Sequence, residues 1–316
     1  MNLIEEAVII EIFGIRVYAF GLYVSIGTLF AVVVLGLAGK FLSLKKGTAL
    51  LTACLSVLLG MLGSRISFCL LNQELGSMTP LSYWPQLNGG GWSLFGMIAG
   101  IYLAGWISAK IMKDRTGAVL DALSLSVLLL IAAERIGESR IEDFDISRPL
   151  DSTFLTESFL ATGGDEPCLA TYYVAAIVAS VLFITLAFMM CRKEREGSLT
   201  IRFLLLFGAA SIITESLRYD RFLSVSFVGL QQVAAAIMLA TGICLSIRYS
   251  NRPKSVLAVT AIVSLPLMVG AVIGLEFALD RTTWNKILIY VLMIISVSIP
   301  ATLGLILMKQ KGKEKT

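Results

Sequence analysis

Long apolar segments separated by short polar connections dominate this chain. Nine of them reach the roughly 20 residues that a helix needs to cross the hydrocarbon core of a bilayer. They lie at 17–39, 47–71, 92–112, 116–137, 168–191, 199–217, 225–247, 255–279 and 287–308. The first segment follows acidic residues and has no small-residue cleavage site, so we expect a retained helix and not a signal peptide.

The composition supports a membrane protein. Hydrophobic residues make up 57% of the chain, charged residues 15%, and the mean hydropathy is +0.84, outside the range of soluble domains. We therefore predict an all-α polytopic membrane protein.

Lysine and arginine gather in every second connection. These connections hold Lys40, Lys45, Lys46, Lys110, Lys113, Arg115, Arg192, Lys193, Arg195, Arg248, Arg252, Lys254, Lys309, Lys311, Lys313 and Lys315. The alternate connections are poor in cations, and the one at 138–167 is mostly acidic. By the positive-inside rule, the N-terminus lies outside and the C-terminus inside. The net charge of +4 follows from this topology, so we expect no nucleic-acid partner.

Polar and aromatic residues cluster at the helix ends that this topology places outside. These residues are Arg16, Tyr18, Arg65, Gly90, Gly91, Ser93, Glu134, Arg135, Tyr172, Tyr173, Glu215, Arg218, Gln231 and Gln232. A guanidinium in hydrocarbon costs roughly 2.5–3.5 kcal/mol unless a carboxylate, water or an anionic ligand offsets it. One interpretation is that the helix ends snorkel into the headgroups. The alternative, favoured by the shared level of so many polar groups, is an outer-leaflet site for an anionic phospholipid headgroup.

Several short motifs resemble the bacterial prolipoprotein diacylglyceryl transferases. The family reads Gly-Gly-x-Ser-Phe-His-Gly-Gly before its third helix, where residues 90–97 read Gly-Gly-Trp-Ser-Leu-Phe-Gly-Met. It reads Gly-Arg-Ile-Gly-Asn-Phe after its fourth, where residues 134–139 read Glu-Arg-Ile-Gly-Glu-Ser, and Asp121 matches the aspartate that opens that helix. It reads Arg-x-x-x-Glu-x-x-Arg in its sixth, where residues 211–218 read Ser-Ile-Ile-Thr-Glu-Ser-Leu-Arg.

Weaker matches complete the series. Residues 63–65 (Gly-Ser-Arg) are similar to the Gly-Ala-Arg of the second helix, and residues 229–231 (Gly-Leu-Gln) to the Gly-Gln of the seventh. Residues 168–173 keep little of the motif before the fifth helix beyond tyrosine. The chain departs from the family at Phe95, Glu138 and Ser211, which replace a histidine, an asparagine and an arginine, and it contains no histidine.

The resemblance implies a domain organisation. Residues 1–249 would form a seven-helix transferase-like core with an exterior cap at 138–167. Residues 250–316 would add two transmembrane helices and a basic cytoplasmic tail. The protein would then be a multi-pass protein of the bacterial plasma membrane.

The resemblance also implies a reaction. The family moves a diacylglyceryl group from phosphatidylglycerol to a lipobox cysteine thiol, which calls for cations around the phosphate and a base for the thiol. We expect phosphatidylglycerol, or another anionic phospholipid, and a prolipoprotein signal peptide as partners. The candidate catalytic residues are Glu134, Arg135, Glu138 and Glu215. The candidate phospholipid-binding residues are Tyr18, Arg65, Gly90, Gly91, Ser93, Arg135, Arg218 and Gln231.

Each candidate carboxylate could instead be the salt-bridge partner of a nearby arginine. The five cysteines lack metal-ligand spacing, and we find no phosphate-binding glycine loop, so we expect no cofactor and no metal. Two other functions remain open: a catalytically degenerate relative that binds phospholipid or lipoprotein, and a small-solute transporter. A transporter should show internal repeats and midplane polar residues, which we do not find in the sequence.

Overall fold

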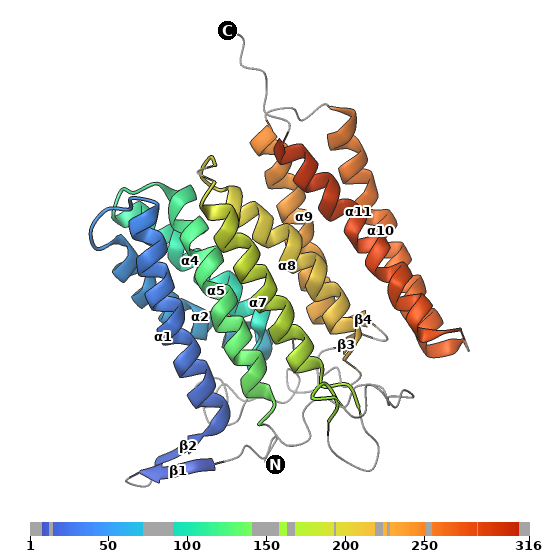
Figure 1. Ribbon diagram of the computed structural model, residues 1–316, viewed down its shortest axis with the longest axis horizontal. Coiled ribbons are helices and arrows are strands. Elements are labelled where there is room, and N and C mark those ends of the chain that lie inside the picture. Colours follow the sequence, from blue (N-terminus) through green and yellow to red (C-terminus); the bar gives the residue numbers. More distant parts are fainter. Residues whose placement is uncertain are drawn as a thin grey trace. The chain divides into compact units, whose positions relative to one another are not determined.

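The computed structural model describes residues 8–12, 15–71, 91–140, 158–162, 168–192, 194–218, 224–225, 228–250, 255–282 and 284–309. Within these residues the chain forms nine helices, each long and apolar enough to cross a membrane (Figure 1). They are α1 (Ala19–Phe41), α2 (Thr48–Leu71), α4 (Leu94–Ile111), α5 (Thr116–Glu138), α7 (Thr171–Met190), α8 (Ser198–Ser216), α9 (Leu230–Ser250), α10 (Val256–Arg281) and α11 (Lys286–Lys309). The predicted all-α polytopic membrane fold is confirmed. The outside location of the N-terminus stays a prediction.

Two short hairpins were not anticipated from the sequence. Strand β1 (Val8–Ile12) pairs antiparallel with β2 (Ile15–Tyr18), and β3 (Ser224–Val225) with β4 (Val228–Gly229). Both precede a helix, so α1 and α9 begin later than the apolar runs at 17–39 and 225–247 indicated. Hydropathy shows how long an apolar stretch is, but not whether its backbone is helical or extended. The β-branched residues of these stretches favour extended backbone.

The chain divides into two compact units. The first comprises residues 1–197 and 217–223, and the second comprises residues 198–216 and 224–316. In the first unit, α5 is the central helix, because it packs against α1, α4 and α7, and α2 packs along α4. The functional candidates on α5 are therefore held by a well-packed element.

Close packing of α2 and α4 depends on the small residues between them. A Cβ added to Gly63 would lie 2.5 Å from the carbonyl oxygen of Gly96, so neither helix could keep its position with a larger residue. Deeper along the pair, the Thr52 and Ser108 hydroxyls are hydrogen-bonded at 2.6 Å. Small residues and hydroxyl bonds of this kind drive helix association where lipid replaces water.

The second unit contains α8, α9, α10 and α11. Helices α8 and α9 pack together, α11 packs against both, and α10 packs mainly on α11. The two C-terminal helices thus share a compact unit with α8 and α9. The expected domain boundary at residue 249 stays a prediction. Of the expected cap, residues 141–157 and 163–167 lie outside the described residues.

Asp114 links the connections at one end of the first unit. Its Oδ2 accepts hydrogen bonds from the Lys45 amide at 2.7 Å and the Thr48 hydroxyl at 2.8 Å, and its Oδ1 accepts one from the Arg115 amide at 2.8 Å. Burial acts to raise the pKa of Asp114, but these bonds and the Lys45 ammonium outweigh it and hold the pKa below its ordinary value of 3.8. The carboxylate form therefore stabilises the fold.

We expect Asp114→Asn to lower the melting temperature of the purified protein at pH 7 by about 2–4 °C, because bonds to a charged acceptor are lost. A depressed folded-state pKa gives stability that is present above the unfolded pKa and is lost as pH falls through the folded pKa. The difference in melting temperature between wild type and variant should therefore shrink once pH drops below about 4. A difference that stays constant from pH 7 to pH 3 would contradict this.

Candidate functional site

The last turn of α5 carries three of the candidate residues. Glu134 and Glu138 are four residues apart and Arg135 and Glu138 three apart, spacings that bring side chains to one helix face. The side chains of Arg135 and Glu138 are only 4% and 6% exposed, and that of Glu134 is 15% exposed. The helix end thus concentrates charge in a buried position.

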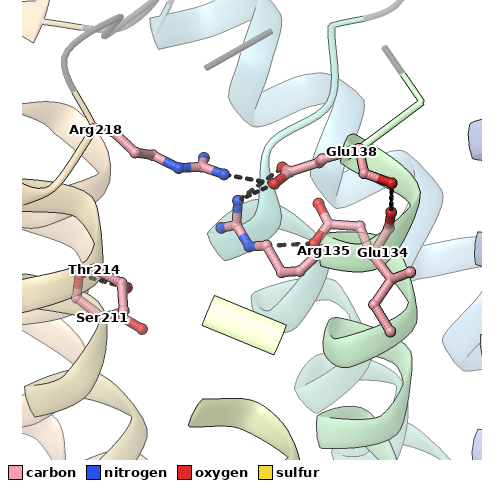
Figure 2. Close-up of polar contacts among 8 residues, drawn as sticks. Glu134, Arg135, Glu138, Ser211, Thr214 and Arg218 are labelled. Atoms are coloured by element: carbon pink, nitrogen blue, oxygen red, sulfur yellow. Dashed lines mark hydrogen bonds and ion pairs between the residues drawn. The ribbon is translucent and has the colours of Figure 1, made fainter. Parts of the chain in front are cut away.

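Arg135 is held between the two carboxylates. Its Nη1 donates to both oxygens of Glu138, at 2.7 Å to Oε1 and 3.0 Å to Oε2 (Figure 2). Its Nε lies 3.5 Å from Oε2 of Glu134. Two carboxylates on different parts of one guanidinium fix its plane, because the donors of arginine form a rigid fork.

A second arginine reaches the same carboxylate from far along the chain. Arg218, which follows the end of α8, donates from Nη2 to Oε2 of Glu138 at 2.5 Å (Figure 2). Its side chain is 8% exposed. Glu138 therefore bridges two guanidinium groups, and the cluster of Glu134, Arg135, Glu138 and Arg218 contains equal numbers of positive and negative side chains.

A separate cluster joins the end of α2 to the start of α4. The buried Arg65 donates from Nη1 to the Gly91 carbonyl at 3.0 Å, and its guanidinium lies 5.8 Å from the centre of the Trp92 ring. The Ser93 amide donates to the Ser64 hydroxyl at 2.9 Å, and the Ser93 hydroxyl caps α4 by accepting from the Gly96 amide at 3.3 Å.

Gly91 is required at this junction by its backbone. Its φ of +79° lies in the left-handed region, and a Cβ there would run into the Phe68 ring. The candidates Arg65, Gly91 and Ser93 are thus brought together. Gly90 lies outside the described residues.

Tyr18 lies at the start of α1, beside the end of α5. It is the N-cap residue of α1 and is half-buried. A Cβ on Gly137 would approach Tyr23 at 3.1 Å and Phe20 at 3.2 Å, so the first turns of α1 pack on the last turn of α5. The candidates on these two helices therefore share one end of the unit.

The second unit holds the remaining candidates, Glu215 and Gln231. Glu215 is 8% exposed. The side-chain amide of Gln231 satisfies its hydrogen bonds when its nitrogen faces Glu215. In that orientation the amide nitrogen lies 3.3 Å from each carboxylate oxygen of Glu215. This pair joins the end of α8 to the start of α9.

The adjacent Gln232 and Glu276 were missed as a pair from the sequence. Nε2 of Gln232 donates to Oε1 of Glu276 at 2.8 Å and to the Ile212 carbonyl at 3.2 Å, and Glu276 is 1% exposed. The two residues line one end of an apolar cavity of about 330 Å³ that extends to Ala240 and Pro266. Glu276 is the only charged residue in the apolar run 255–279, and that isolation is the signal in the sequence.

The structure brings Arg135 and Arg218 together through Glu138, whereas Arg65 belongs to the α2–α4 cluster. The expectation that all three arginines surround one cavity stays a prediction.

Comparison with known proteins agrees with the resemblance carried by the sequence motifs. A family model for prolipoprotein diacylglyceryl transferase matches residues 7–248. A protein of Finegoldia magna named phosphatidylglycerol–prolipoprotein diacylglyceryl transferase is 21% identical over 248 residues, which cover 78% of this chain and 97% of the relative. A protein of Clostridioides difficile with the same name is 22% identical over 250 residues, covering 79% and 98%. One of Clostridium tetani is 21% identical over 245 residues, covering 75% and 95%. Helices α10 and α11 lie beyond the matched range.

Proposed function

Because this chain belongs to the prolipoprotein diacylglyceryl transferase family, we propose that it moves a diacylglyceryl group from phosphatidylglycerol to the lipobox cysteine thiol of a prolipoprotein at the outer leaflet. It is a multi-pass protein of the bacterial plasma membrane and a transferase of lipoprotein biosynthesis. The observation that carries the proposal for the site is the convergence of Arg135 and Arg218 on one anionic group.

The reaction is a displacement at a glyceryl carbon. The cysteine thiol gives its proton to a base, and the sulfur forms a bond to the carbon next to the phosphate. The bond from that carbon to the phosphate oxygen breaks, its electron pair stays on the oxygen, and glycerol phosphate leaves. Negative charge grows on the phosphate, so guanidinium groups placed around it lower the barrier. Arg135 and Arg218 are the cations that this site offers.

We assign the base role to Glu134. A thiol has a pKa near roughly 8.5, so at neutral pH it needs a proton acceptor. Glu138 already accepts bonds from two guanidinium groups, and Glu215 faces Gln231. Glu134 is the most exposed of the carboxylates in the Arg135 cluster, and its Oε2 lies 3.5 Å from Nε of Arg135. Its exposure makes it the carboxylate of this cluster that a substrate thiol can best reach.

The other candidates have supporting roles in this proposal. Gly91 and Ser93, held at the α2–α4 junction with Arg65, would form a surface for the headgroup. Tyr18 would border the site from α1, and Glu215 with Gln231 would orient the ends of α8 and α9.

Two experiments test the proposal. The gene should restore viability and lipoprotein maturation in a bacterium depleted of its own diacylglyceryl transferase. The purified protein should transfer labelled diacylglyceryl from phosphatidylglycerol to a lipobox peptide, and should not modify a peptide whose cysteine is replaced by serine. Failure of both, with retained binding of phosphatidylglycerol, would identify a catalytically degenerate relative.

A further inference from the structure

A single carboxylate lies where an anionic ligand of this site would bind. Nη1 of Arg135 and Nη2 of Arg218 both point at Glu138, at 2.5–3.0 Å from its oxygens (Figure 2). All three side chains are more than nine-tenths buried. Two guanidinium groups that converge on one point repel each other, and the carboxylate of Glu138 between them offsets that repulsion.

We propose that Glu138 is an internal ligand that occupies the phosphate position between Arg135 and Arg218, and that the phosphate of phosphatidylglycerol binds by displacing it. This inference rests on the proposed function and adds a mode of regulation to the same site. The site of this chain is closed by its own carboxylate when no lipid is present, and lipid affinity is set by competition between carboxylate and phosphate.

The exchange is chemically balanced. A carboxylate and a phosphodiester each carry one negative charge, and both accept the parallel bonds that an arginine fork donates. Replacement of one by the other therefore leaves the charge next to the guanidinium groups unchanged. Glu138 is also the last residue of α5, and its side chain can turn away from the cluster without breaking the helix.

A purely structural salt bridge predicts the opposite behaviour. If Glu138 only orients the arginines, its removal should disorder them and weaken lipid binding, because a buried charge left without its partner is costly. If Glu138 competes with the phosphate, its removal should strengthen lipid binding, because the lipid then supplies the missing anion. The two roles are separated by the sign of the change in affinity.

The test measures equilibrium binding of dioctanoyl-phosphatidylglycerol to the purified full-length protein. We expect Glu138→Gln to lower the dissociation constant by at least about tenfold, or about 1.4 kcal/mol. Dioctanoylglycerol, which has the same chains and no phosphate, should bind wild type and variant alike. Glu196→Gln is the matched control, because Glu196 pairs with Arg115 at 2.5 Å in an exposed connection elsewhere, and it should leave the affinity unchanged.

Two further variants make the result decisive. Glu134→Gln removes an equal charge beside the same arginine without vacating the position between the two guanidinium groups, so we expect a clearly smaller gain in affinity. Equal gains for both variants would show a general field effect and overturn displacement, as would a loss of affinity in Glu138→Gln. Should that variant fail to fold, Glu138→Asp withdraws the carboxylate by one carbon, and weaker binding than wild type would overturn the proposal. Because no step measures transfer, an inactive protein that binds more tightly would contradict only the proposed function.

Discussion

Arg135→Lys should reduce diacylglyceryl transfer nearly as much as Arg135→Ala, by about 100-fold or more, because catalytic electrostatic groups typically have effects of this size. In the structure Arg135 uses Nη1 for both oxygens of Glu138 and approaches Glu134 with Nε. A lysine keeps the positive charge but presents one compact ammonium, which cannot contact two groups in fixed planar geometry. A lysine at position 135 should therefore attract the phosphate but position it poorly.

The measurement is transfer from phosphatidylglycerol to a lipobox peptide by purified variants whose folding is verified by thermal melting. Arg115→Lys is the matched control, since Arg115 forms an exposed ion pair with Glu196, and it should retain wild-type activity. A snorkelling arginine would tolerate lysine, which reaches the headgroups equally well. Full activity of Arg135→Lys would therefore make Arg135 an interfacial anchor and move the site elsewhere.

Glu134→Gln should lower the turnover rate by about 100-fold or more, the usual contribution of a general base, with a much smaller effect on lipid affinity. The variant's rate should rise more steeply with pH than that of wild type between pH 7 and 9, because the substrate thiol then ionises without a base, with a pKa near roughly 8.5. Lost orientation of Arg135 alone would not produce this recovery.

The carboxylate variants should be compared singly and together. Glu138→Gln alone should change mainly the affinity for the lipid. The double variant, with both substitutions, should combine the lipid affinity of Glu138→Gln with the slow turnover of Glu134→Gln. Unchanged transfer in all three variants would exclude any role for these carboxylates in catalysis.

The spans were predictable because a bilayer restricts the backbone. With no water to satisfy amides, a long apolar segment can cross only as a helix, so hydropathy identifies all nine described helices. The pairing of Arg135 with Glu138 also follows from spacing along one helix. The hairpins before α1 and α9 were not predicted from the sequence, because hydropathy does not distinguish extended from helical apolar residues.

The long-range contacts could not be predicted from spacing. Arg218 meets Glu138 across 80 residues, and Gln232 meets Glu276 across 44. The sequence predicts that Glu138 and Arg218 lie at the same depth in the membrane. Their positions within that plane depend on how the helices pack, which residue spacing does not show. The role of Glu138 as a bridge between two arginines is visible only in the three-dimensional structure. In the sequence, a carboxylate near one arginine fits an ordinary ion pair equally well.

The neighbouring glutamines at the start of α9 have a consequence for the two C-terminal helices. Successive residues of a helix point roughly 100° apart, so Gln231 and Gln232 cannot face the same partner. Gln231 faces Glu215 on α8, while Gln232 donates both to Glu276 on α10 and to the Ile212 carbonyl on α8. The α10 contact therefore adds to the α8 contacts that hold the rotation of α9 about its own axis, and with it the direction in which Gln231 points. Although α10 lies beyond the family match, it contributes a polar contact that helps to hold a helix inside the match in this rotation.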